Sequence, residues 1–259
     1  QAHGITQFTA PFGWISYPQA MAMWCRRHMV KYGTTSEQLG TLAVTFRDNA
    51  ALNPRAMQRQ PISMDDYLSA RPIVDPFRML DICLESDGAC AVLVTSAERA
   101  KDLRHTPVYI MSGANGGGAN QGDDLFDCLR WEDHSENYSA YIADDLWGGA
   151  GVGPEDVDVA EIYDCFTYSV VAQLEGLGFC LPGEGPDFIQ GGRIARDGAL
   201  PLNTHGGLLS EAYIHGLNHV VEAVDQLRGD AGPRQIPGAE IALTTAGAMT
   251  VGSALVLRN

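Results

Sequence analysis

The sequence predicts an α/β fold in which helices cover both faces of a central sheet. Segments with the apolar pattern of strands alternate with segments of helical periodicity along most of the chain. Two strand-like segments near the C-terminus, 241–247 and 253–258, are joined by a short connection and predict an antiparallel hairpin. No tandem short repeat is visible. Alternation of this kind is typical of a sheet covered on both faces.

Helical patterns dominate the beginning of the chain. The stretch PQAMAMWCRRHMVKY (18–32) has a proline in its first turn and contains good helix formers. Gly33 suits the C-terminal end of that helix. A second helix is expected from Ser36 to a residue before Pro54. The stretch MDDYLSA, directly after Ser63, predicts a short third helix.

The middle of the chain predicts two strands and a loop. After a turn at residues 86–88, the apolar run ACAVLVTS (89–96) predicts a strand, and PVYIMS (107–112) predicts another. Residues 113–122 contain five glycines but match neither the P-loop nor the dinucleotide-binding spacing. We therefore expect a flexible connection there. The next helix is expected to begin at Ser135.

The last third of the chain continues the alternation. VAEIY (159–163) predicts a strand that leads into a helix at FTYSVVAQLEGLGF (166–179). LPLNTHGG (200–207) predicts a strand and a turn. The helix that follows places apolar residues at helical spacing on one face. These residues are Leu217, Val220, Val221, Val224 and Leu227.

Composition limits the classes of function. The chain has 259 residues, a formal net charge of −15 and 45% hydrophobic residues, enough for a substantial core. Such acidity repels phosphate backbones and argues against nucleic-acid binding, although local Arg or Lys residues can still bind the phosphates of CoA. No signal-peptide pattern is visible, and no run approaches the ~20 apolar residues that cross a bilayer. We expect a cytoplasmic protein without a membrane span.

Cysteine spacing does not indicate a metal site. None of the six cysteines forms a CxxC pair, which favours reduced, buried thiols over disulfides or a metal cluster. The six are Cys25, Cys83, Cys90, Cys128, Cys165 and Cys180.

Two segments of the last third resemble active-site motifs of one enzyme family. DVDVAEIYDCFTYSVVAQLEGLGFC is similar to the segment of sterol-carrier-protein-type thiolases in which a strand ends in His-Asp-Cys-Phe. Here Tyr163 replaces the histidine, and residues 164–166 keep the rest of the motif. LNTHGGLLSEAYIHGLNHVVEAVDQLRG is similar to the segment with the Gly-His-Pro motif, where Ala212-Tyr213-Ile214 now stands and Gly216 still follows.

Two further segments extend the resemblance over nearly the whole chain, from about Gln7 onward. AGPRQIPGAEIALTTAGAMTVGSALVL resembles the closing hairpin, which carries a second active-site cysteine in classical thiolases; here Thr245-Ala246-Gly247 has none. SDGACAVLVTS resembles the strand that closes the N-terminal half of those proteins. Several motifs in the right order are far more specific than one.

The resemblance implies a thiolase fold, with layers α-β-α-β-α, that is incomplete at the N-terminus of this chain. Residues 1–104 would be the remainder of the N-terminal half with its cap and loop region, and residues 105–259 the C-terminal half. The chain opens on Gln1, in a stretch that looks like the middle of a longer sequence. The segment expected before it would carry the nucleophilic cysteine of a true thiolase.

Tyrosines at both histidine positions are similar to the pattern of the bacterial steroid side-chain-cleaving aldolases. The resemblance implies cleavage of a 17-hydroxy steroid that bears a short acyl-CoA side chain, giving a 17-ketosteroid and propionyl-CoA in sterol degradation. It also implies a homodimer, a partner hydratase with an OB-fold domain, and no cofactor apart from the CoA of the substrate. An acyl-CoA thiolase or acyltransferase, or a non-catalytic lipid- or acyl-CoA-binding subunit, are the alternatives.

The chemistry of the two tyrosines favours carbon–carbon cleavage over thiolysis. A phenol has a reference pKa of about 10 and is a poor substitute for imidazole as a base near pH 7. A retro-aldol reaction needs removal of an alcohol proton, donors for an enolate oxygen and an acid, all without a covalent intermediate. We hypothesise that Tyr163 and Tyr213 share these roles, the alternative being two structural aromatic residues.

Five further residues are weaker candidates. Asp164 is expected to orient Tyr163 or to cap the helix that follows at Phe166. His205 is a candidate general acid or base, or else a solvated turn residue. His215 and His219 are spaced for zinc but lack an HExxH motif and a third ligand, so no metal is expected. Cys165 is expected to pack rather than react.

Overall fold

The computed structural model describes residues 4, 6–14, 16–118, 131, 133 and 135–259. The helices are α1 (Thr6–Thr9), η1 (Ala10–Phe12), α2 (Tyr17–Tyr32), α3 (Ser36–Ala51), α4 (Met64–Ser69), η2 (Met79–Asp81), α5 (Ala97–Ala100), α6 (Ser139–Ala150), η4 (Pro154–Asp156), α7 (Thr167–Gly176), α8 (Gly185–Phe188), α9 (Gly207–Ser210), α10 (Leu217–Arg228) and η5 (Gly232–Arg234). The strands are β1 (Pro72–Val74), β2 (Phe77–Arg78), β3 (Tyr109–Gly116), β4 (Val159–Glu161), β5 (Ile241–Gly247) and β6 (Gly252–Arg258).

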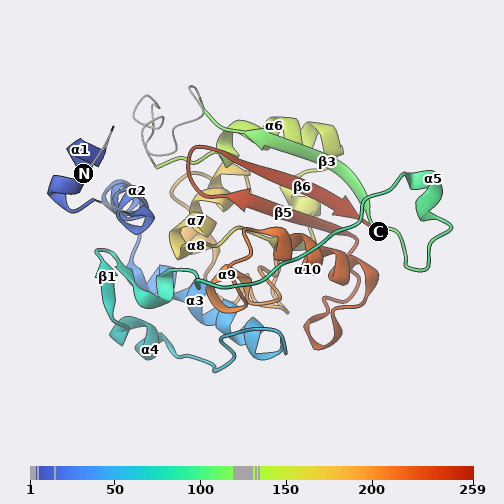
Figure 1. The fold of residues 1–259 in the computed structure, drawn as a ribbon, viewed down its shortest axis with the longest axis horizontal. Helices are drawn as coiled ribbons and strands as arrows, with labels where there is room; N and C mark the ends of the chain where they lie inside the picture. Colours follow the sequence, from blue (N-terminus) through green and yellow to red (C-terminus); the bar gives the residue numbers. More distant parts are fainter. Residues whose placement is uncertain (1–3, 5, 15, 119–130, 132, 134) are drawn as a thin grey trace.

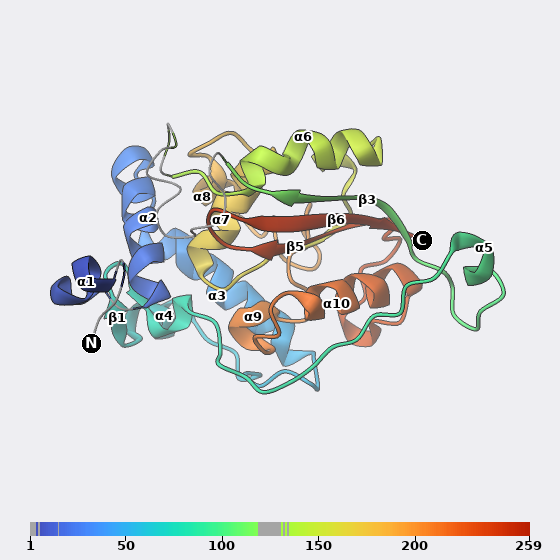
Figure 2. The same cartoon turned by 45° about the horizontal axis from the view of Figure 1, so that its top comes forward.

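A four-stranded mixed sheet in the order β3-β6-β5-β4 is the centre of the structure (Figure 1). The closing hairpin β5–β6 is antiparallel, β3 is antiparallel to β6, and β4 is parallel to β5. Helix α6 covers one face, and α9 and α10 lie on the other (Figure 2). The predicted α/β layering is thus confirmed. Among the described residues, the short pair β1–β2 is the only other sheet. Of the five layers expected, α-β-α-β-α, the described residues therefore form only one of the two β layers.

The N-terminal helices have the predicted positions and ends. Helix α2 has a proline in its first turn and ends at Gly33, whose φ of 83° is left-handed and therefore suits glycine. The side chain of Thr35 caps α3 by accepting a hydrogen bond from Gln38 N, and that of Ser63 caps α4 by accepting one from Asp66 N. The cap of α3 is therefore one residue before Ser36, where the helix begins.

Two predicted strands are wrong. Residues 89–96 form no strand, and Val92, Leu93 and Val94 are 39%, 89% and 71% exposed. No described strand pairs with this segment, and an apolar pattern without backbone partners does not make a sheet. Residues 200–207 contribute only an isolated bridge between Leu202 and Ala160 before the chain turns into α9.

The glycine-rich segment 113–122 is partly a strand. Strand β3 continues to Gly116, which pairs with Gly252 of β6. Cross-strand pairing outweighs the low strand propensity of glycine here, because residues 112–116 pair in register with residues 252–256 of β6. Residues 119–122 lie outside the described part of the chain.

Helix α10 buries a polar face, contrary to its apolar pattern. Leu217 is 39% exposed, and the valines of the predicted stripe are only partly buried. The face that packs on β4 and β5 carries polar side chains that find partners inside the protein, described below. The buried residues of α10 are Asn218, His219, Glu222, Ala223, Gln226 and Leu227.

No helix in the described ranges combines the length and apolar character that crossing a bilayer requires.

Candidate active site

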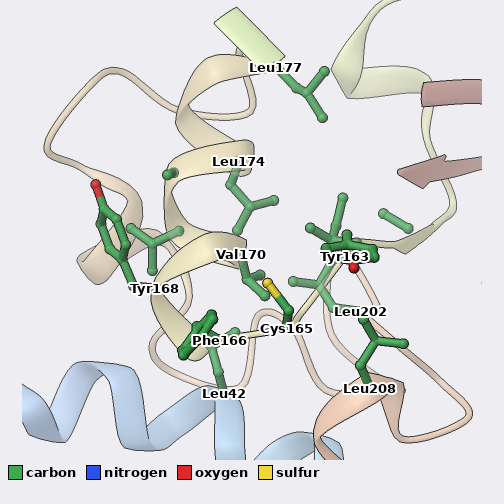
Figure 3. Close-up of a cluster of buried hydrophobic side chains, with 14 of the residues drawn as sticks. Leu42, Tyr163, Cys165, Phe166, Tyr168, Val170, Leu174, Leu177, Leu202 and Leu208 are labelled. Atoms are coloured by element: carbon green, nitrogen blue, oxygen red, sulfur yellow. The ribbon is translucent and has the colours of Figure 1, made fainter. Parts of the chain in front are cut away.

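Tyr163 lies just beyond the end of β4, and three polar side chains hold its backbone. Its N–H donates to Thr245 Oγ1 at 2.8 Å, while its carbonyl oxygen accepts from Gln173 Nε2 at 2.8 Å and from Ser169 Oγ at 2.9 Å. The side chain is 6% exposed and lies beside Cys165 in the buried cluster next to α7 (Figure 3). The predicted site residue is thus rigidly placed, which a reactive group requires.

Tyr213 approaches from the segment between α9 and α10. Its phenol oxygen lies 2.8 Å from that of Tyr163, and the ring centroids are 6.2 Å apart. The backbone N–H of Tyr213 donates to Ser86 Oγ at 3.2 Å. Gly216 has a φ of +83°, and a Cβ there would lie 3.1 Å from Tyr163 Cδ2, so a glycine both permits the turn and leaves room for the ring. The structure therefore brings together the two tyrosines that the sequence singled out.

Both phenols are neutral near pH 7. Burial raises the pKa of Tyr163, and the neighbouring Cys165 raises it further. Burial also raises the pKa of Tyr213, although the hydrogen bond from Tyr163 acts in the opposite direction. Tyr213 is the only described polar partner of the buried Tyr163 hydroxyl, and an unpaired buried O–H costs about 1–3 kcal/mol. Tyr163 therefore donates to Tyr213, whose own proton remains available to a bound molecule.

Asp164 serves a different helix from the predicted one. Its carboxylate accepts hydrogen bonds from Leu208 N at 2.7 Å and Leu209 N at 3.2 Å, in α9. The helix that follows it, α7, has Phe166 as its N-cap, without a side-chain cap. The expectation that Asp164 caps α7 is therefore wrong, whereas its role in orienting Tyr163 stays a prediction. Its role is to fix the start of α9, the element that leads to Tyr213.

His205 is fully buried, so its alternative as a solvated turn residue is wrong. Its Nδ1 lies 2.9 Å from Glu161 Oε2, and its Nε2 lies 3.1 Å from His219 Nδ1. Burial by itself lowers the pKa of His205, but Glu211 and Glu161 outweigh it and raise the pKa to about 10. No described contact joins His205 to either phenol, so its predicted role as a general acid or base stays a prediction without geometric support.

The zinc pair considered from the sequence does not form. His219 is buried, whereas His215 is exposed and lies against the Tyr213 ring, with centroids 4.4 Å apart. Among the described residues, one group could offer three ligand atoms to a metal ion, and its atoms lie within 4.8 Å of one another. It consists of Glu161, His205 and His219.

Cys165 has the environment of a packing residue. The side chain is buried, and burial above all raises the pKa of its thiol, which opposes the thiolate that a nucleophile needs. Cys25, Cys83, Cys90 and Cys180 are likewise free thiols, and Cys128 lies outside the described residues.

The polar side chains that hold these residues were not predicted from the sequence. Gln173 and Ser169 lie on α7, and both donate a hydrogen bond to the carbonyl oxygen of Tyr163. Glu161 and Glu211 surround His205. One sequence feature could have indicated these two glutamates, because each lies two residues before a site tyrosine, at positions 161 and 211. Spacing alone, however, does not say which way a side chain points.

Comparisons with known proteins bear on the family resemblance and the fold. Residues 137–259 match the family model described as thiolase C-terminal domain-like. Over these residues the chain is similar to the thiolases. The steroid side-chain-cleaving aldolase of Thermomonospora curvata is 43% identical over 248 residues, which cover 95% of this chain and 63% of the relative. The 17-hydroxy-3-oxo-4-pregnene-20-carboxyl-CoA lyase of Mycobacterium tuberculosis is 43% identical over 252 residues, which cover 96% and 64%.

A solved structure shows the fold of this thiolase-like chain. The structure described as an Ltp2-ChsH2(DUF35) aldolase superposes with a TM-score of 0.93 at 41% identity, covering 98% of this chain and 66% of that one. The predicted thiolase fold and the resemblance to steroid side-chain-cleaving aldolases are confirmed. The chain spans 63% and 64% of the length of the two curated relatives named above. The family model lies inside the predicted half 105–259, whose boundary stays a prediction.

Proposed function

We propose that the protein containing this chain is a carbon–carbon lyase that cleaves a 17-hydroxy steroid acyl-CoA ester by a retro-aldol reaction. The products are a 17-ketosteroid and propionyl-CoA. One observation carries the proposal: the hydroxyl oxygens of Tyr163 and Tyr213 lie 2.8 Å apart. In the motifs that this chain shares with thiolases, histidines stand at these two positions. Two relatives whose names describe steroid side-chain cleavage and a steroid-CoA lyase support the substrate class.

A proton shuttle across the phenol pair accounts for the chemistry with both tyrosines neutral. One phenol oxygen takes the proton of the 17-hydroxyl group while the bond between C17 and the side chain breaks and its electrons form an enolate on the thioester. The phenols pass a proton along their hydrogen bond, and the second phenol protonates the enolate carbon. Every proton is accounted for, and no depressed pKa is required. A phenol donor also stabilises the charge that develops on the thioester oxygen.

The neutral phenols argue against the thiolase alternative. A thiolase needs a base that activates a thiolate, whereas burial raises the pKa of both tyrosines. The stretch Thr245-Ala246-Gly247 has no cysteine, and Thr245 is used instead to hold the Tyr163 backbone. No observation favours a non-catalytic binding subunit over an enzyme.

The partner is also a proposal. We expect the protein to act with a partner subunit, because the solved structure it resembles is described as an Ltp2-ChsH2(DUF35) aldolase. The OB-fold domain of that partner is expected from the family resemblance. A homodimer is expected from the same family resemblance.

Tyrosine variants of the full-length protein test the function. Mixed with its partner and a 17-hydroxy steroid-CoA, the wild type is expected to release ketosteroid and propionyl-CoA in equal amounts. Tyr163→Phe and Tyr213→Phe are each expected to lower kcat about 100–1,000-fold, the effect of removing one transition-state donor. Tyr168→Phe is the matched control, because its buried hydroxyl donates to Ser135 O, outside the site. Full activity in both site variants would refute the proposal, and acetyl transfer to CoA would favour the thiolase.

A further inference from the structure

The interior next to the two phenols holds more buried carboxylates than described cations. Four carboxylates, each at most 9% exposed, surround the turn at residues 203–206. Arg234 neutralises one of them, with bonds of 3.0 and 2.8 Å to Glu222. Buried anions are unfavourable unless a cation pairs with them. The four are Glu161, Asp164, Glu211 and Glu222.

Other arginines nearby do not supply the missing charge. Arg55 is 56% exposed and reaches Glu211 only at 3.9 Å. Arg47 is buried on α3, but its described hydrogen bonds go to Ser210 Oγ and Gln60 O. The remaining titratable groups that face the carboxylates are the imidazoles of His205 and His219.

The two imidazoles form a chain between two of the carboxylates. His205 Nδ1 lies 2.9 Å from Glu161 Oε2, His205 Nε2 lies 3.1 Å from His219 Nδ1, and His219 Nε2 lies 3.4 Å from Asp164 Oδ1. Neither carboxylate contact has hydrogen-bond geometry, so both are ion-pair contacts. His205 has a carboxylate near each ring nitrogen, because Glu211 Oε2 lies 3.5 Å from Nε2. An imidazolium carries a proton on both nitrogens and can pair with two carboxylates, whereas a neutral ring carries only one.

The same chain connects the segments that carry the phenols. Asp164 directly follows Tyr163 and anchors α9. Glu211 lies two residues before Tyr213, 3.5 Å from His205 Nε2. Asn218 Nδ2 donates to Glu211 Oε2 at 2.9 Å and to Ala212 O at 3.2 Å, so the backbone next to Tyr213 is tied to this cluster.

We propose that His205 carries a positive charge and that this buried imidazolium positions Tyr163 and Tyr213 at hydrogen-bond distance. The charge resides on His205, which faces both Glu161 and Glu211. Its raised pKa agrees with this assignment. The histidines touch no phenol oxygen and act through Asp164 and Glu211, so they are positioning residues. The activity readout rests on the proposed lyase function, whereas the protonation state does not.

A metal ion does not replace the proton in this geometry. Glu161 contacts Nδ1 of His205, whereas His219 faces Nε2 on the other side of the same ring. One ion bound to a single nitrogen of His205 cannot keep both contacts. The three residues thus form a chain rather than a coordination shell.

Nitrogen NMR of ¹⁵N-histidine-labelled full-length protein tests the protonation state directly. We expect both nitrogens of His205 to carry protons at pH 8, and stoichiometric metal to be absent by elemental analysis. The proposal would be overturned by a neutral His205 at pH 7. It would also be overturned by one equivalent of bound zinc whose removal by a chelator changes the His205 and His219 signals. Both results are independent of any catalytic activity.

Matched histidine variants test the positioning. His205→Gln is expected to lower kcat about 100-fold at little changed KM, the effect of a displacement of about 1 Å. In ¹³Cζ-tyrosine spectra it should shift the Tyr163 and Tyr213 signals. His28→Gln is the control, because His28 is equally buried and pairs with Glu175 at 3.1 Å away from the phenols. It should leave kcat and both signals unchanged. Unchanged tyrosine signals in a folded His205→Gln variant would refute the positioning, even if the lyase assay fails throughout.

Discussion

Removal of the Arg234 guanidinium should be among the most destabilising single changes in this chain. Arg234 makes two charge-assisted bonds, of 3.0 and 2.8 Å, to a carboxylate that is 0% exposed. In Arg234→Met, Glu222 stays buried without its strongest cation. Breaking one side of such a pair costs about 3–5 kcal/mol. For a protein of this size about 2–4 °C of Tm corresponds to 1 kcal/mol. We therefore expect a fall in Tm of roughly 6–20 °C.

Thermal and urea unfolding followed by circular dichroism measure this effect, with two comparison variants. The double variant Arg234→Met/Glu222→Leu should recover most of the loss, because an apolar pair of similar volume removes the unpaired charge. Arg26→Met removes an exposed ion pair with Asp75 and should cost less than about 1 kcal/mol. If Arg234→Met unfolds within about 1 kcal/mol of the wild type, the buried pair does not stabilise the fold as argued.

The same pair predicts a pH dependence. Burial opposes ionisation of Glu222, but Arg234 and then His205 outweigh it and lower its pKa in the folded state. A lowered folded pKa contributes stability that is present above the unfolded value of about 4.3 and is lost as the pH falls through the folded value. The difference in unfolding free energy between the wild type and Arg234→Met should therefore shrink below about pH 4.

Two further predictions concern the site itself. The pKa of His205 is raised to about 10 in the folded state, against about 6.5 in the unfolded state. Its contribution to stability is therefore fully present below about pH 6.5 and is lost as the pH rises towards 10. The urea midpoint of the wild type should fall over that range, and that of His205→Gln should fall less. Gly216→Ala should lower the free energy of unfolding by about 1–2 kcal/mol, because alanine is strained in the left-handed conformation. Its methyl group, 3.1 Å from Tyr163 Cδ2, should also lower kcat. Gly229→Ala is the control: this glycine is also left-handed (φ +78°) but has open space around it, so the variant should lose similar stability at unchanged kcat.

Local signals in the sequence predicted most helices and the closing hairpin. Proline, glycine and cap residues set the ends of α2, α3 and α4 because these signals act within a few residues. Strands depend on partners far along the chain, which explains the two failures. Residues 89–96 have an apolar strand pattern without a described neighbour, whereas the glycines of 113–116 form a strand because β6 lies beside them.

The candidate site was predictable where it rests on motif positions and unpredictable where it rests on orientation. Motif resemblance selected Tyr163 and Tyr213, which meet. Helical periodicity suggested that the valines of α10 face the core, but the buried face carries His219 and Glu222. A polar face is buried only when partners from distant segments satisfy it, and Arg234 and His205 are such partners. No local pattern reports that arrangement.

The residues that differ from the thiolase motifs lie in contact with one another. A change from carbon–carbon cleavage to thiolysis would therefore involve several of them together. Tyr163 and Tyr213, at the two histidine positions, share a hydrogen bond. Thr245, in the stretch that lacks the second cysteine, binds the N–H of Tyr163. Ala246 lies across from Gly216, beside the ring of Tyr163. A single Tyr→His change would therefore leave one phenol without its partner and would not restore a base–cysteine pair. Thiolysis would require concerted changes at all three positions.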